Sequence, residues 1–141
     1  MARIDVREIT VPAALKSVER VREFVNDYVS GLGLDEEQRL KVELSLYEIC
    51  VNIALYAYPQ VPPGTGEMAV RLWREDGKLV IQVRDKGIPF NPVRKKNPDM
   101  LLRLRRGLPG GLGVYFYRTL MDGLTYRRVR GENVLTVRKT L

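Results

Sequence analysis

Apolar and polar residues alternate near the start of the chain and then change to a helical spacing. Residues 3–10 alternate as a half-buried strand does. Between about residues 13 and 30, apolar positions recur every three or four residues and stop at a pair of glycines, which predicts an amphipathic helix. Asp35 is a favourable cap for a second helix, which we expect to continue to about Tyr58 because Pro59 follows.

The second half of the chain has the spacing of two hairpins separated by a long segment and a helix. The four strands are expected at residues 67–74, 78–85, 124–130 and 133–140. Residues 91–109 contain three prolines, many cations and no sustained period, so they predict a long loop, and loops of this length are usually functional. A third helix is expected from Gly111 to about Asp122, where apolar residues again recur at helical spacing.

Strands joined by hairpins, with helices between them, predict one domain over residues 1–141. The expected fold class is α+β, a two-layer α/β sandwich whose mixed, mostly antiparallel sheet is covered by helices on one face. A chain of 141 residues can bury about two thirds of its unfolded surface, so one core suffices. No stretch reaches the roughly 18 apolar residues that span a bilayer, and no apolar signal core is visible, so we expect a cytoplasmic protein without a membrane partner.

The composition limits the chemistry that the chain can perform. It contains no histidine and a single cysteine, Cys50. Zinc fingers, Ser-His-Asp triads and Cys-His nucleophiles are therefore excluded, because the residues they need are missing. Any catalysis must use carboxylates, amides, backbone groups or a bound ion.

The net charge of +7 is unevenly distributed along the chain. Residues 1–70 carry 7 Lys and Arg against 11 Asp and Glu, a net charge of −4, whereas residues 71–141 carry 17 against 6, a net charge of +11. A basic half suits nucleic acid, an acidic protein partner or a polyphosphate. Many of these cations alternate along predicted strands, and no basic-aromatic motif of a known reader is present, so direct nucleic-acid binding is the less favoured reading.

Three short stretches carry the candidate chemistry. Glu48 and Asn52 lie four residues apart and therefore on one face of the second predicted helix. Residues 85–90, DKGIPF, follow directly on a predicted strand, and residues 110–113, GGLG, open the third predicted helix. Each stretch alone also has an ordinary interpretation, as a solvated helix face, a turn and a flexible loop.

In their order and spacing, EICVN, DKGIPF and GGLG resemble the N box and two glycine boxes of the histidine-kinase-like (GHKL) ATPase superfamily. The closing run GGLGVYFYRTLMDGLTYRR, followed by NVLTVRKTL, is most similar to the branch of anti-sigma-factor serine-protein kinases. The resemblance covers about residues 10–141. It implies a Bergerat-type ATP-binding fold with an ATP lid at about residues 91–109, and it implies ATP and Mg²⁺ as cofactors.

The resemblance also implies roles for individual residues. The amide oxygen of Asn52 is a hard ligand suited to Mg²⁺, and Glu48 is placed to orient or deprotonate a nucleophile beside the phosphates. Asp85 would accept a hydrogen bond from the adenine amino group, while Gly87 would let the backbone lie close to the ring. Thr136 matches a family threonine that lies near the adenine. The alternative interpretation is an ordinary threonine of a strand, paired with a residue of the neighbouring strand.

Further nucleotide contacts follow from the same resemblance. Tyr56 stands where relatives often have a histidine, and Arg106 lies in the expected lid, where it would screen phosphate charge or meet an acidic partner. Backbone N–H groups at the start of a helix approach phosphates, which is the role expected of Gly110, Gly111, Leu112 and Gly113.

We therefore expect an ATP-dependent serine-protein kinase that acts as an anti-sigma factor. It would bind a sigma factor, phosphorylate a serine of an anti-sigma-factor antagonist and pair as a homodimer. Two alternatives stay open, a non-catalytic nucleotide-binding module that controls partner binding and a DNA-binding protein. Ile49 and Cys50 are bulkier than the small residues common at these positions, so the sequence leaves open whether phosphotransfer is fast.

Overall fold

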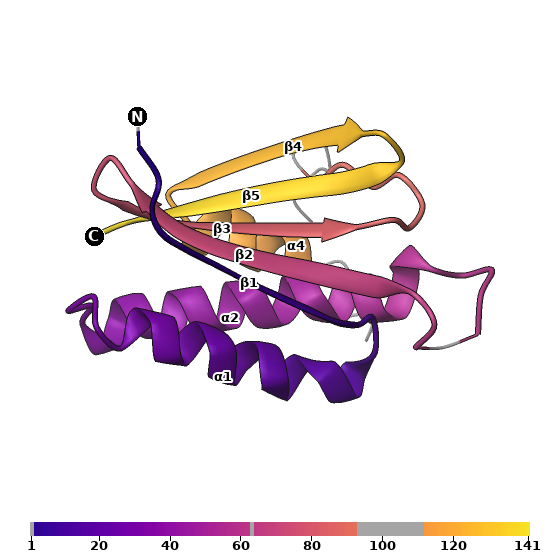
Figure 1. The fold of residues 1–141 in the computed structure, drawn as a ribbon, viewed down its shortest axis with the longest axis horizontal. Coiled ribbons are helices and arrows are strands. Elements are labelled where there is room, and N and C mark those ends of the chain that lie inside the picture. Colours follow the sequence, from indigo (N-terminus) through magenta and orange to yellow (C-terminus); the bar gives the residue numbers. More distant parts are fainter. Residues whose placement is uncertain (1, 63, 93–111) are drawn as a thin grey trace, which may run out of the picture.

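An antiparallel sheet of five strands forms one layer of the protein (Figure 1). The computed structural model describes residues 2–62, 64–92 and 112–141. The strands are β1 (Ile4–Pro12), β2 (Glu67–Glu75), β3 (Lys78–Asp85), β4 (Gly123–Val129) and β5 (Glu132–Thr140). Their order across the sheet is β1-β2-β3-β5-β4, and every neighbouring pair is antiparallel.

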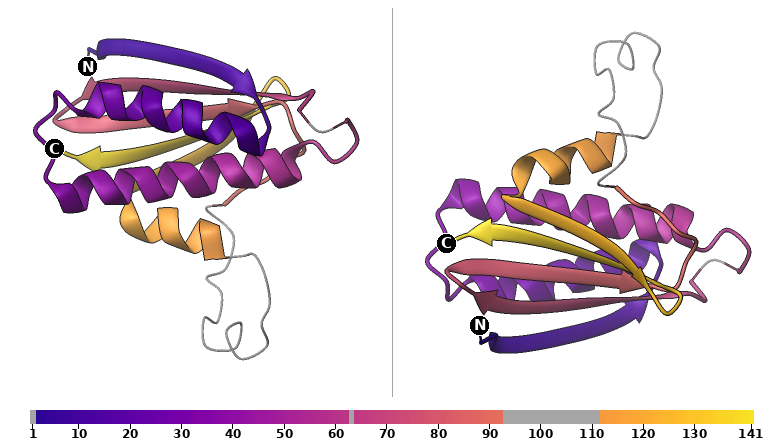
Figure 2. Two further views of the ribbon diagram at one scale, coloured as in Figure 1. Left: turned by 90° about the horizontal axis from the view of Figure 1, so that it is seen from below. Right: turned by 90° about the horizontal axis from the view of Figure 1, so that it is seen from above.

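The helices lie together on one face of this sheet, which confirms the predicted α+β class (Figure 2). They are α1 (Val18–Val29), which follows a 3₁₀ turn at Leu15–Ser17, then α2 (Glu36–Asn52), its continuation η2 (Ile53–Ala57) and α4 (Leu112–Leu120). Seen from the side of the helices and from the side of the sheet, α2 lies between α1 and α4 (Figure 2).

The second helix begins and continues as the sequence predicts, but its last turn differs. Asp35 caps α2 through a capping box, accepting a hydrogen bond from the backbone N–H of Gln38 at 2.7 Å. The α-helical geometry ends at Asn52, and residues 53–57 form a wider π-helical turn instead. Such turns occur frequently at functional sites.

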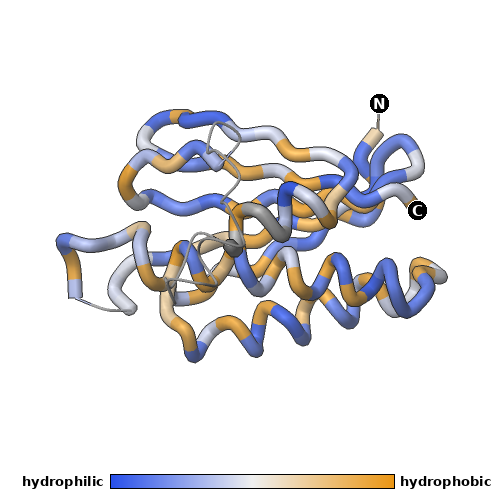
Figure 3. The backbone as a smooth tube through the Cα atoms, turned by 180° about the vertical axis from the view of Figure 1, so that it is seen from behind, coloured by the Kyte–Doolittle hydropathy of each residue, from blue (hydrophilic) through white to orange (hydrophobic). Residues whose placement is uncertain are grey.

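Hydrophobic positions recur along the strands in the backbone trace (Figure 3). Alternate residues of the central strands are buried in the core between the two layers. Leu72 of β2 pairs with Ile81 of β3, which pairs with Val137 of β5, and all three side chains are buried against the helices. The residues between them face the opposite side of the sheet. There the Trp73 indole pairs across the strands with Val80 and lies under the Arg3 guanidinium, 4.1 Å from the ring centroid.

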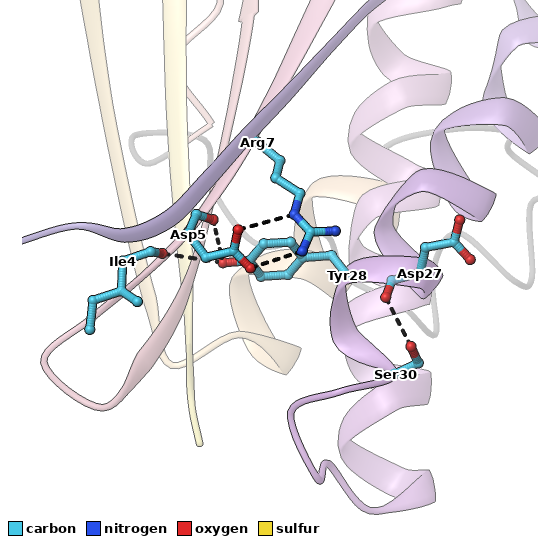
Figure 4. A network of polar contacts seen from close by, with 6 residues as sticks. All are labelled: Ile4, Asp5, Arg7, Asp27, Tyr28 and Ser30. Carbon is cyan, nitrogen blue, oxygen red and sulfur yellow. Dashed lines mark hydrogen bonds and ion pairs between the residues drawn. The ribbon is translucent and has the colours of Figure 1, made fainter.

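Edge strand β1 is fixed to α1 at a bulge (Figure 4). Asp5 adopts a left-handed backbone with a φ of 52°, and the pairing with β2 shifts between Ile4 and Arg7. The phenol of Tyr28 donates a hydrogen bond to the carbonyl oxygen of Asp5 at 2.8 Å. The Arg7 guanidinium pairs with the Asp5 carboxylate at 3.0 Å and lies over the Tyr28 ring at 5.2 Å.

Removing the Tyr28 hydroxyl should loosen this attachment without creating a cavity. We expect Tyr28→Phe to lower the free energy of unfolding by about 1 kcal/mol, the usual net value of one such hydrogen bond. Urea denaturation measures the change, and Tyr47→Phe is the matched control because the Tyr47 side chain is half exposed. Equal stability of the parent and Tyr28→Phe would contradict the assignment.

Candidate nucleotide-binding site

The first part of the site lies at the end of α2, where Glu48 and Asn52 are one helical turn apart. Both side chains are partly exposed. Burial raises the pKa of the Glu48 carboxyl above its usual range. A carboxylate with a raised pKa is a better proton acceptor, so this position suits a general base.

Helix α4 closes one side of this region by packing along α2. Its Tyr117 is almost fully buried, and its phenol lies near the Asn52 side chain. Burial raises the pKa of Tyr117, the Asn52 side chain lowers it, and the nearby Glu48 charge raises it. The structure therefore brings Glu48, Asn52 and Tyr117 into one cluster.

The second part of the site is Asp85, the last residue of β3. Its Oδ1 accepts hydrogen bonds from the backbone N–H of Gly87 and from Nδ2 of Asn133, both at 2.9 Å. Burial raises the pKa of Asp85, while those two hydrogen bonds and the charge of Arg128 lower it. Among the described residues both donors bind Oδ1, and no hydrogen bond is found on Oδ2.

Asn133 holds this carboxylate and was not identified in the sequence. It pairs with Asp85 across β3 and β5, and its Nδ2 also donates to the carbonyl oxygen of Ile88 at 2.8 Å. Its Oδ1 accepts from the Tyr126 hydroxyl at 2.6 Å and from the backbone N–H of Phe90 at 3.3 Å. The register of the last strand against β3 would have identified Asn133, because it places this residue opposite Asp85.

The turn after Asp85 packs directly on the end of η2. The backbone N–H of Ile88 donates to the carbonyl oxygen of Ala57 at 2.8 Å. A Cβ atom added to Gly87 would overlap that same oxygen, so only glycine fits there. The Tyr58 hydroxyl accepts from the backbone N–H of Lys86 at 2.7 Å. These contacts join the Asp85 turn to the helix that carries Glu48 and Asn52.

The remaining predicted residues divide into four groups. Tyr56 lies on η2 with 60% of its surface exposed. Thr136 is not brought to Asp85, because it alternates with the core residues of β5 and accepts a hydrogen bond from Gln82 Nε2 at 3.4 Å on the opposite face of the sheet. Leu112 and Gly113 form the first turn of α4. Arg106, Gly110, Gly111 and residues 93–109 of the expected lid lie outside the described residues.

The amide oxygen of Asn52 fits a Mg²⁺ ion that takes most of its ligands from phosphates and water. In the described part of the chain, no group of three or more His, Cys, Asp or Glu side chains is placed to hold a metal ion. Mg²⁺ usually takes only one or two protein ligands and obtains the rest from phosphates and water. A single amide oxygen beside a carboxylate one turn away is compatible with that mode of binding.

The comparisons with known proteins show which family the chain belongs to. The sequence profile of the histidine kinase-like ATPase domain family matches residues 11–139. The chain belongs to this family. Two proteins named serine-protein kinase RsbW, from Bacillus thuringiensis (strain Al Hakam) and Bacillus cereus (strain 03BB102), are each 29% identical to it over 139 residues, covering 96% of this chain and 85% of each relative. The resemblance drawn from the three motifs is thus confirmed.

A solved structure supports the fold of this histidine kinase-like ATPase domain. The crystal structure of the RsbU and RsbW domains of Rv1364c from Mycobacterium tuberculosis superposes with a TM-score of 0.64 at 16% identity. The match covers 96% of this chain, which spans 32% of that longer polypeptide. A family of ATPase domains implies ATP as the ligand of the site. Separately, none of the helices in the described ranges is long and apolar enough to cross a membrane.

Burying the Asp85 charge should cost stability at neutral pH. The raised pKa means that the folded state holds this proton more tightly than the unfolded chain does, so stability falls as pH rises through the window between the usual and the raised value. Asp85→Asn keeps an oxygen for both donors without the charge. We expect the variant to melt at a higher temperature than the parent at pH 7, with the difference shrinking toward pH 4.

Thermal melts from pH 4 to pH 8 measure this difference. Asp76→Asn, in the exposed turn between β2 and β3, controls for the loss of one negative charge. A difference between Asp85→Asn and the parent that stays constant across this pH range would contradict the burial argument.

Proposed function

We propose that the protein is an ATP-dependent serine-protein kinase that acts as an anti-sigma factor. The observation that carries the proposal is the contact of the Asp85 turn with η2, because it ties a buried carboxylate to a helix bearing Glu48 and Asn52. An acceptor for a purine, an amide for a metal and a candidate base then belong to one site. The similarity to RsbW serine-protein kinases supports the choice of reaction.

The adenine would lie at Asp85. Its Oδ2 accepts a hydrogen bond from the exocyclic amine, while Asn133 and Gly87 hold Oδ1 on the other side. Arg128 donates to the carbonyl oxygen of Gly87 at 2.8 Å and so fixes the turn from the side of β4. The carboxylate that binds the amine would thus be held in one orientation by Asn133 and the Gly87 turn before the ligand arrives.

The phosphates would lie toward the end of α2. Asn52 would hold Mg²⁺ through its amide oxygen, and the ion when bound neutralises charge on the phosphates. Glu48 takes the proton from the serine hydroxyl of the protein substrate as its oxygen attacks the γ-phosphorus. The new O–P bond forms, the bond from the γ-phosphorus to the bridging oxygen breaks, and ADP leaves.

The proposed partners follow from the resemblance to the anti-sigma-factor branch. They are a sigma factor, which the protein sequesters, and an antagonist protein that supplies the serine. A homodimer is part of the same proposal. Ile49 and Cys50 do not weaken it, because both side chains are buried in the core cluster between the layers.

Nucleotide selectivity tests the role of Asp85. GTP has a carbonyl where ATP has its amine, so Oδ2 would face an acceptor. We expect ATP to bind more tightly than GTP by roughly 1.5 to 3 kcal/mol, or about 10- to 100-fold, the usual value of a hydrogen bond to a charged group. Calorimetric titration of both nucleotides measures it, and Asp85→Ala should remove the preference. Equal affinities in the parent would count against Asp85.

Separate substitutions test the two roles on α2. Asn52→Ala should weaken both Mg²⁺-dependent nucleotide binding and phosphotransfer, because one ligand serves both. Glu48→Gln should leave nucleotide affinity nearly unchanged and lower transfer by about 10²- to 10⁴-fold, the usual contribution of a positioned base. Calorimetry and labelled-ATP transfer to an antagonist protein measure the two effects, with thermal melts of each variant.

Two results would change the assignment. A Glu48→Gln protein that transfers phosphate at the parent rate would exclude Glu48 as the base. A parent that binds ATP but forms no phosphoprotein with any antagonist would instead support a regulatory module that uses nucleotide only to control partner binding.

A further inference from the structure

The hydroxyl of Tyr58 bridges three segments of the chain beside Asp85. Tyr58 directly follows η2, and its ring lies so close to Gly66 that a Cβ atom added there would overlap it. The hydroxyl donates a hydrogen bond to the carbonyl oxygen of Glu67 at 2.5 Å and accepts one from the backbone N–H of Lys86 at 2.7 Å. One phenol oxygen therefore joins the end of η2, the start of β2 and the turn after β3.

The two backbone groups that the phenol binds are the ones that would otherwise pair with each other. The ladder between β2 and β3 ends with Met68 opposite Asp85. Glu67 and Lys86 are the next two residues in this register. The preceding carbonyl, that of Gly66, accepts a hydrogen bond at 2.7 Å from the backbone just after β1, so the carbonyl of Glu67 faces β3. The phenol thus occupies the place of the next ladder hydrogen bond.

An oxygen atom inserted at this point changes the course of the chain after β3. Paired strands lie about 4.8 Å apart, and a direct hydrogen bond would continue that spacing past Asp85. The inserted hydroxyl separates the two strands, and the chain turns toward η2, where Gly87 lies against Ala57. Because the backbone N–H of Gly87 binds Oδ1 of Asp85, the position of this turn sets the position of the carboxylate.

We propose that Tyr58 is a positioning residue that ends the ladder at Asp85 and thereby directs this carboxylate toward the adenine. Without the hydroxyl, the N–H of Lys86 and the carbonyl of Glu67 lose their partner, while the ring still keeps them apart. The turn then no longer holds Asp85 in the one position that a directional hydrogen bond requires. The specificity half of this inference rests on the proposed function, whereas the place of the hydroxyl in the ladder does not.

The place of the hydroxyl is tested without any nucleotide. Tyr58→Phe keeps the ring and removes both hydrogen bonds. We expect the backbone amide of Lys86 to exchange with water about 10-fold faster in this variant, the factor that corresponds to one lost hydrogen bond. Native-state hydrogen exchange followed by NMR measures this rate.

Two controls separate this local effect from a general loss of stability. The amide of Ile81, in the middle of β3, reports opening of the whole sheet and should change less than that of Lys86. Tyr47→Phe, on a half-exposed position of α2, should leave both rates unchanged. A Lys86 amide that exchanges at the parent rate in Tyr58→Phe, or one that accelerates only as much as Ile81, would overturn the proposal.

The specificity half is tested by the affinities for ATP and GTP, measured by calorimetry. Tyr58→Phe should lower the affinity for ATP by about 10-fold and leave that for GTP nearly unchanged, because only ATP presents an amine to Asp85. In an Asp85→Ala background, the same substitution should have no further effect on either nucleotide.

Two outcomes would overturn the specificity half. Equal losses for ATP and GTP in Tyr58→Phe would indicate a merely structural role. If the Lys86 amide accelerates but the parent does not distinguish ATP from GTP, the place of the hydroxyl stands, whereas the assignment of Asp85 in the proposed function fails.

Discussion

One backbone contact, between the turn after β3 and the end of η2, determines how the site is assembled. The helices and the sheet are separate layers, and each contributes one half of the candidate site. The hydrogen bond from Ile88 to Ala57 and the close approach of Gly87 bring these halves together. Ala57, the acceptor of this hydrogen bond, is the last residue of the π-helical turn.

The polar groups around Asp85 show how a charge is kept in a nearly buried position. Burial opposes the ionised form, and the donors on Oδ1 together with the charge of Arg128 oppose that penalty only in part. Tyr126 and Asn133 complete the network from β4 and β5. The ionised carboxylate of Asp85 therefore costs stability that an amide at this position would retain.

The sequence predicts the elements well because their patterns are local. Helical spacing alone places Glu48 and Asn52 on one face, and the hairpin spacing places Asp85 at the end of a strand. Asn133 was missed, and the position of Thr136 on the face opposite Asp85 was not foreseen, because both depend on the register of β5 against β3, where a shift of one residue reverses the faces. The burial of Tyr117 depends on how α4 packs against α2, which no local pattern encodes.

The position of Trp73 has a practical consequence for experiments. It is the only tryptophan of the chain, and it lies on the face of the sheet opposite the helices and Asp85, beneath Arg3. Its fluorescence therefore reports the integrity of the sheet from the face opposite the candidate site. The molecule thus contains an optical probe of folding that is spatially separate from Asp85.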